Sequence, residues 1–79
     1  MLIMIEFKDR FRSLVDPLEM SKTQCAKEIG ISYKTFSNAY TLGKVPRIRL
    51  VIRIAYYFDV SIEYLLGRTD KKSYKKIRS

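Results

Sequence analysis

Apolar residues recur near the start of the chain at the spacing of one helix face. They lie four, four and three residues apart, at Ile3, Phe7, Phe11 and Leu14. The polar residues between them are predicted to face solvent: Asp9, Arg10, Arg12 and Ser13. Pro17 disfavours helical geometry at the residue before it, Asp16. The first helix is therefore predicted to span about Leu2 to Val15.

Two further helices are predicted on either side of a short turn. Ser21, with Gln24 three residues later, has the form of a capping box and opens a helix that Gly30 ends. Ser32 caps the next helix, which is predicted over about 33–42.

The second half of the chain predicts two more helices. The fourth covers about 47–58, after a loop at 43–46. Its inner stripe is predicted to consist of Ile48, Val51, Ile52, Ala55 and Phe58. Ser61 caps a short fifth helix over about 62–66, which Gly67 ends. No segment alternates strictly enough to predict a strand, so the fold class is predicted to be all-α.

Length and charge narrow the range of functions. A chain of 79 residues, 47% of them apolar, is expected to form one small domain. Sixteen Lys and Arg residues against eight Asp and Glu give a net charge of +8. That charge favours nucleic acid, an anionic membrane surface or an acidic protein as partner. No apolar run reaches the roughly 18 residues of a membrane span, and Met1 to Ile5 is too short for a signal peptide.

Catalysis and metal binding have little support. The chain has no histidine, which removes the commonest general base and metal ligand. Its carboxylates show no metal-ligand spacing, and no phosphate loop is present. Cys25 is the single cysteine and is predicted to be a buried, unreactive side chain. We therefore expect neither an enzyme nor a cofactor.

The segment 22–42 has the form of a helix-turn-helix, because three residues containing a glycine separate its two helices. The small Ala26 allows the helices to approach closely, and Ile31 fills the corner between them. The remaining inner-face residues are Cys25, Ile29, Phe36 and Ala39.

The chain resembles the Cro and phage-repressor helix-turn-helix family, also called the XRE family, over roughly Arg10 to Asp70. The matching elements are Ser21, Ala26, Gly30, Ile31-Ser32, Thr35-Phe36-Ser37, Pro46, Ile54-Ala55, Val60-Ser61 and Tyr64-Leu65-Leu66-Gly67. The resemblance implies a compact five-helix bundle of the lambda-repressor-like type. It also divides the chain into a DNA-binding domain over 1–70 and a basic tail over 71–79. Departures from the family pattern are Pro17, Lys22 for Gln, Ala39-Tyr40 for an aromatic-Glu pair, and Asp59 for Gly.

The resemblance implies that the helix over about 33–42 enters the major groove of double-stranded DNA. Its outward face is predicted to consist of Tyr33, Lys34, Ser37, Asn38 and Thr41. Asn38 can pair bidentately with an adenine edge, and Lys34 can reach guanine or a phosphate. Phosphate contacts are expected from Lys22, Thr23, Lys44, Arg47 and Arg49. The 30–58 segment carries five basic residues and no acidic one, which supports this surface.

The implied function is sequence-specific DNA binding by a transcriptional regulator, of the kind that phages and mobile elements use as repressors, in the bacterial cytoplasm at the nucleoid. It would act as a symmetric homodimer, with recognition helices about 34 Å apart. Surface aromatic residues suggest a dimer interface, at Leu50, Tyr56, Tyr57 and Tyr64. The alternative for the tyrosines is that they cover a small core.

Two other functions remain open at this stage. The protein could be an antitoxin or adaptor that mainly grips a protein partner. It could also bind RNA or a membrane surface through the tail, whose nine residues include five basic and no acidic ones. The tail hypothesis predicts that cutting the chain at Asp70 abolishes binding, whereas the DNA hypothesis predicts that the shortened domain still recognises its site.

Overall fold

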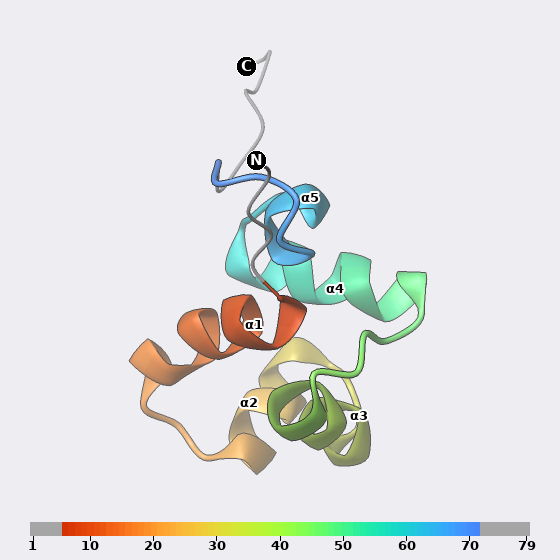
Figure 1. The fold of residues 1–79 in the computed structure, drawn as a ribbon. Coiled ribbons are helices and arrows are strands. Elements are labelled where there is room, and N and C mark those ends of the chain that lie inside the picture. The colour runs from red at the N-terminus through yellow and green to blue at the C-terminus, as the bar shows by residue number, and fades with distance from the viewer. Residues whose placement is uncertain (1–5, 72–79) are drawn as a thin grey trace.

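The computed structural model describes residues 6–71, and within them every regular element is helical (Figure 1). The elements are α1 Phe7–Val15, η1 Asp16–Leu18, α2 Lys22–Ile29, α3 Tyr33–Ser37, η2 Asn38–Leu42, α4 Ile48–Phe58 and α5 Ile62–Leu65. The short η1 is a 3-10 turn and η2 is a π-helical turn. The predicted all-α fold with five α-helices is confirmed. Residues 72–79 of the predicted tail lie outside the described residues.

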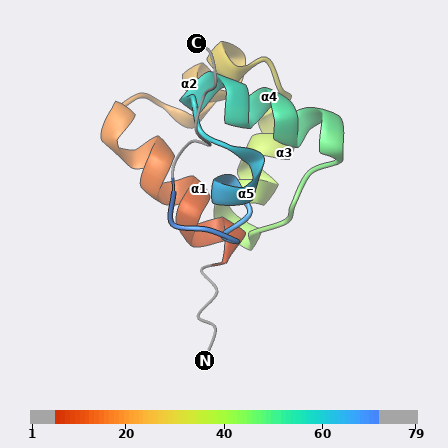
Figure 2. The ribbon, with the colours of Figure 1, turned by 90° about the horizontal axis from the view of Figure 1, so that it is seen from above.

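The helices form two groups, α2 with α3 and η2, and α4 with α5, and α1 packs against both groups. The α2–α3 pair occupies the end of the molecule opposite α5 (Figure 1). Viewed from the α5 end, α5 lies between α1 and α4, and it packs on both (Figure 2). The other face of α1 packs against η2, while α2 contacts α4. This arrangement leaves the outer side of α3 uncovered.

Phe11 lies at the centre of the core. It has no exposed surface, and its ring stacks on Phe7 at a centroid distance of 5.5 Å. Edge-to-face contacts join it to Phe36 at 5.3 Å and to Phe58 at 6.5 Å. One α1 residue therefore joins the helix-turn-helix to α4, and such aromatic pairs stabilise the fold beyond their buried area.

The first helix is shorter than predicted. It begins at Phe7, because Glu6 is in an extended conformation and serves as N-cap. Residues 2–5, including Ile3, lie outside the described residues. The predicted end at Val15 is confirmed, and the 3-10 turn that contains Pro17 follows directly.

The predicted inner stripe of α4 is partly wrong. Val51 and Ala55 are buried as expected, and Ile54, which the stripe left out, has no exposed surface. Ile48 and Ile52, in contrast, are exposed. Nearly every position of α4 is apolar, so periodicity alone does not decide which face packs inward. The contacts with α2 and α5 select the Val51–Ile54–Ala55 face.

Three serines cap helices as predicted. The hydroxyls of Ser21, Ser32 and Ser61 each accept the backbone N–H three residues later, at 3.0, 3.1 and 3.0 Å. The capping box at α2 is only half formed: the Gln24 side-chain amide donates to Glu28 at 3.0 Å, and the Ser21 N–H makes no hydrogen bond to the Gln24 side chain. These local hydrogen bonds fix where α2, α3 and α5 begin.

Asp59 ends α4 in the left-handed region, with φ 56° and ψ 45°. A side chain that carries a Cβ is strained there, although Asp less so than most. We expect Asp59→Gly to raise the free energy of unfolding by about 0.5–1 kcal/mol, partly offset by the greater freedom of glycine in the unfolded chain. Urea unfolding followed by circular dichroism would measure this. Asp59→Asn should match the wild type, and an Asp59→Gly protein no more stable than Asp59→Asn would contradict the strain.

Candidate nucleic-acid interface

A tight turn of three residues, 30–32, joins α2 to α3. Gly30 ends α2 with φ 91°, and its N–H and that of Ile31 both donate to the carbonyl of Ala26, at 2.8 and 3.0 Å. Ile31 is buried in the corner, and Ala26 is buried below it. The predicted packing of the helix-turn-helix is therefore confirmed residue by residue. Cys25 is also buried as predicted, and burial, with a smaller effect of the Glu28 carboxylate, raises the pKa of its thiol.

The helix predicted over 33–42 occurs in two parts, α3 and η2. At the junction, the Asn38 carbonyl accepts the N–H of Gly43, which is the longer bond of a π turn, and also that of Lys44 at 3.2 Å. Phe36 and Ala39 are fully buried and hold both parts on the core. The wider turn changes the direction of the side chains after Asn38.

The residues predicted to read DNA lie on the uncovered side of this segment. Tyr33, Lys34 and Thr41 are exposed, whereas Ser37 and Asn38 are half-buried. The Thr41 hydroxyl donates to the Ser37 carbonyl at 2.6 Å, so only its oxygen lone pairs remain for a partner. All five side chains reach the surface, and their contact with DNA stays a prediction.

Tyr40 connects the recognition segment to α1 and α2. Its ring lies 4.6 Å from the Arg12 guanidinium carbon and 4.7 Å from Lys22 Nζ, and its carbonyl accepts a hydrogen bond from Arg12 at 2.8 Å. The Tyr40 hydroxyl donates to Asp16 Oδ1 at 2.6 Å, and this bond is the main reason why its pKa is raised. Lys22, an expected phosphate contact, is thus held beside the recognition segment. Sequence reasoning missed Arg12 and Tyr40, although Tyr40 stands where the family pattern breaks.

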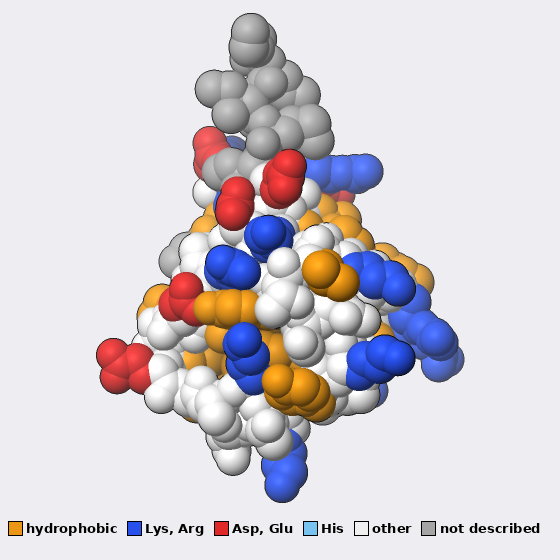
Figure 3. Space-filling view, turned by 60° about the horizontal axis from the view of Figure 1, so that its bottom comes forward, with side chains coloured by type: hydrophobic (Ala, Val, Ile, Leu, Met, Phe, Trp, Pro, Cys, Tyr) orange, Lys and Arg blue, Asp and Glu red, His pale blue; other side chains and the backbone are white. Residues whose placement is uncertain are grey.

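An open groove of about 390 Å³ runs between α3 and α4. It is lined by Thr35, Asn38, Lys44, Val45, Pro46, Arg47, Arg49, Leu50 and Arg53. The fold thus gathers four predicted DNA-binding residues and adds Arg53, which the sequence did not assign. The lining contains four cationic side chains and no carboxylate. On the face that carries the recognition segment, Asp and Glu lie mainly toward the margins (Figure 3).

Of the four residues predicted at a dimer interface, Tyr56 alone is fully exposed. Leu50, Tyr57 and Tyr64 are half-buried against the core. Tyr56 is 86% exposed and continues a stripe along α4 with Ile48 and Ile52, which are 60% and 49% exposed. We call these three residues the α4 stripe. The sequence placed both isoleucines in the core and therefore missed it.

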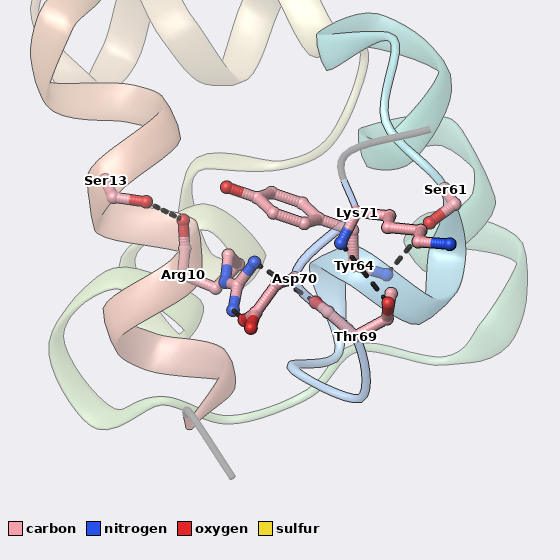
Figure 4. Close-up of polar contacts among 7 residues, drawn as sticks. All are labelled: Arg10, Ser13, Ser61, Tyr64, Thr69, Asp70 and Lys71. Atoms are coloured by element: carbon pink, nitrogen blue, oxygen red, sulfur yellow. Dashed lines mark hydrogen bonds and ion pairs between the residues drawn. The ribbon is translucent and has the colours of Figure 1, made fainter. Parts of the chain in front are cut away.

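Arg10 corrects the solvent face predicted for the first helix, because it is only 5% exposed. Its guanidinium carbon lies 3.9 Å from the centre of the Tyr64 ring. Arg10 also donates to the Thr69 carbonyl at 3.4 Å and lies 3.8 Å from Asp70 Oδ1 (Figure 4). Since α1 packs on α5, the arginine stem is enclosed while its head reaches polar groups. The contact explains why Tyr64 is half-buried against the core.

Two other kinds of feature, a metal centre and a membrane-spanning helix, have no counterpart between residues 6 and 71. No group of three or more His, Cys, Asp or Glu side chains in that range is arranged to hold a metal ion. No helix in the same range is long and apolar enough to cross a membrane.

Comparison with known proteins agrees with this geometry. Residues 7–73 match the family described as the bacteriophage CI repressor helix-turn-helix domain. The chain is 31% identical over 61 residues to the uncharacterized HTH-type transcriptional regulator YobD of Bacillus subtilis (strain 168). The match covers 77% of this chain and 54% of the relative, so the chain spans about half the length of that protein. No solved structure matches.

Proposed function

This chain belongs to the bacteriophage CI repressor helix-turn-helix family, and on that premise we propose that it is a sequence-specific DNA-binding regulator of transcription, of the repressor type. The uncovered polar side of α3, next to a groove with four cations and no carboxylate, is the observation that carries the proposal. A recognition segment in the major groove would place the cations beside the phosphates that border that groove. The printed name of the Bacillus relative, an HTH-type transcriptional regulator, supports the same role.

The proposed contacts divide into two kinds. Asn38, Lys34 and Tyr33 would read base edges, because an amide pairs with adenine, an ammonium pairs with guanine, and a tyrosine ring packs on a thymine methyl. The phosphate contacts would come from Lys22, Thr23, Lys44, Arg47 and Arg49. Ser37 and Thr41 would serve the recognition segment as adaptable hydrogen-bonding groups. None of these roles needs a cofactor or a catalytic group.

Fluorescence anisotropy at two salt concentrations tests the proposal. The whole chain would be titrated against duplex DNA from its own upstream region and against a scrambled duplex of equal length. We expect the native duplex to bind at least about a thousandfold more tightly at equal salt. Equal binding to both duplexes, lost steeply as salt rises, would contradict sequence recognition in that region and would favour a purely electrostatic binder.

We also propose that the protein binds DNA as a symmetric homodimer through the α4 stripe. Ile48, Ile52 and Tyr56 lie four residues apart and are exposed, so two copies could pack these residues against each other across a two-fold axis. Leu50, Tyr57 and Tyr64 would support the interface from behind, since they pack on the core. Burial of the stripe would remove exposed apolar surface from water in both copies.

Ile52→Glu is expected to break this dimer, because it places two carboxylates near the two-fold axis. Affinity for a duplex with two half-sites should fall by about ten- to a hundredfold, while affinity for a single half-site stays the same. Analytical ultracentrifugation and anisotropy would measure the two effects. Ser13→Glu adds the same charge at an exposed position of α1 and serves as control. An Ile52→Glu protein that still binds as a dimer would exclude the α4 stripe as the interface.

The α4 stripe also favours a second candidate function, that of an adaptor or antitoxin which grips a protein partner. This second function would be favoured over homodimerisation as the role of the α4 stripe if the protein is monomeric on DNA and Ile52→Glu leaves DNA affinity unchanged.

A further inference from the structure

Arg53 lies where α4 passes the turn of the helix-turn-helix. A Cβ atom built on Gly30 would come within 3.1 Å of Arg53 Nη1 and 3.4 Å of its Cδ. The arginine side chain therefore extends from α4 across the turn that connects α2 and α3. It is exposed, and it lines the same groove as Thr35 and Asn38 of the recognition segment.

Among the described residues, the charge of Arg53 has no carboxylate partner. Within residues 6–71 no Asp or Glu forms an ion pair with Arg53, and no carboxylate lines the groove. Its stem is packed against the turn, so part of the entropy cost of placing the guanidinium is already met in the folded protein. A pre-positioned and unpaired guanidinium is suited to bind an external anion, and its planar fork of donors matches the oxygens of a phosphate.

We propose that Arg53 binds a phosphodiester of the DNA backbone and so extends the phosphate-binding wall from the α3–α4 loop to the turn of the helix-turn-helix. This inference rests on the proposed function and deepens it. Lys44, Arg47 and Arg49 line the groove from the loop and the start of α4, and Arg53 adds a cation one turn of α4 further along. A recognition segment seated in the major groove would then be held by cations along the length of the groove. The contact would position the protein and would carry no sequence information.

The same contact gives Gly30 a second role. The φ of 91° already favours glycine at this position. In addition, a Cβ atom at residue 30 would lie 3.1 Å from Arg53 Nη1, so the guanidinium would have to shift by a few tenths of an ångström. Substitution of Gly30 would combine backbone strain with this displacement, so the test is better made at Arg53 itself.

Arg53→Gln keeps much of the stem and removes the charge. With native and scrambled duplexes, we expect both affinities to fall by a similar factor, so that their ratio stays the same. The slope of log K against log salt should become less steep by about 0.9 for each Arg53 on the duplex. Lys27→Gln, which removes an exposed charge on α2 outside the groove, should leave the slope unchanged. Arg53→Lys should keep the wild-type slope, since it keeps the charge.

The outcomes separate this inference from the proposed function. An unchanged slope in Arg53→Gln, with the native duplex still preferred, would overturn the role of Arg53 and leave sequence recognition standing. A loss of preference for the native duplex, rather than a uniform loss of affinity, would also overturn it, because Arg53 would then be reading bases. A wild-type protein without any preference would instead overturn the proposed function. If Arg53→Gln unfolds, the slope of Arg53→Lys against that of Arg53→Met decides the question.

Discussion

Replacement of Asn38 by alanine is expected to reduce the preference for the native duplex by about thirtyfold or more. A bidentate contact of asparagine with adenine is worth about 1–3 kcal/mol of discrimination, and a symmetric dimer would lose the contact in both half-sites. The scrambled duplex should bind almost as before, because the phosphate contacts remain. The fold should survive, since the Asn38 hydrogen bonds to Gly43 and Lys44 use its backbone carbonyl.

Anisotropy titrations of the wild type, Asn38→Ala and Lys44→Gln against both duplexes would measure this effect. Lys44→Gln is the matched control, because it removes a cation from the wall of the same groove and should weaken both duplexes alike. If Asn38→Ala kept the wild-type preference, Asn38 would not be a base contact. The recognition role would then pass to Tyr33 and Lys34.

Phe11→Ala is expected to lower the free energy of unfolding by about 3–5 kcal/mol. Phe11 has no exposed surface and contacts the rings of Phe7, Phe36 and Phe58, so the substitution would leave a cavity between α1, α3 and α4. A domain of this size has a total stability of about 4–12 kcal/mol. If the wild-type stability lies at the lower end of this range, a large share of the variant should be unfolded at 37 °C and DNA binding should fall in proportion.

Urea unfolding followed by circular dichroism, at fixed protein concentration, would test this expectation. Tyr33→Ala is the control, because Tyr33 is exposed and lies outside both the core and the α4 stripe, so its loss should change stability by less than about 0.5 kcal/mol. A loss of less than about 1 kcal/mol in Phe11→Ala would mean that the three helices close around the gap, and that Phe11 does not organise the core.

The parts of the fold that the sequence predicted well depend on interactions close in the chain. Ser21, Ser32 and Ser61 bond the N–H three residues later, and Gly30 ends α2, so each signal lies next to the boundary that it sets. The inner face of the helix-turn-helix was likewise predictable, because its residues must fill a short corner. Family resemblance then supplied the role of the outward face.

The errors concern contacts between residues distant in the chain. Arg10 was assigned to solvent because its partners, Tyr64, Thr69 and Asp70, come more than fifty positions later. The inward face of α4 was misassigned because almost every residue of that helix is apolar, and only its packing on α2 and α5 distinguishes them.

Arg53 was not predicted to line the groove for a similar reason. Nothing near it in the sequence reveals that its side chain crosses the turn at Gly30. A run of basic residues indicates a cationic surface, but the folded chain decides which of them share a groove.

The π turn at Asn38–Leu42 affects how operator specificity could be transferred between relatives. Side chains copied onto α3 at Tyr33–Ser37 would point where an ordinary helix directs them. Beyond Asn38 the turn is wider, so a helical wheel drawn for an α-helix assigns Thr41 and Leu42 the wrong direction. A graft of a foreign recognition helix onto this scaffold would therefore need an offset after Asn38. Two relatives that share the residue at position 41, but of which one lacks the π turn, would present that residue to different base pairs.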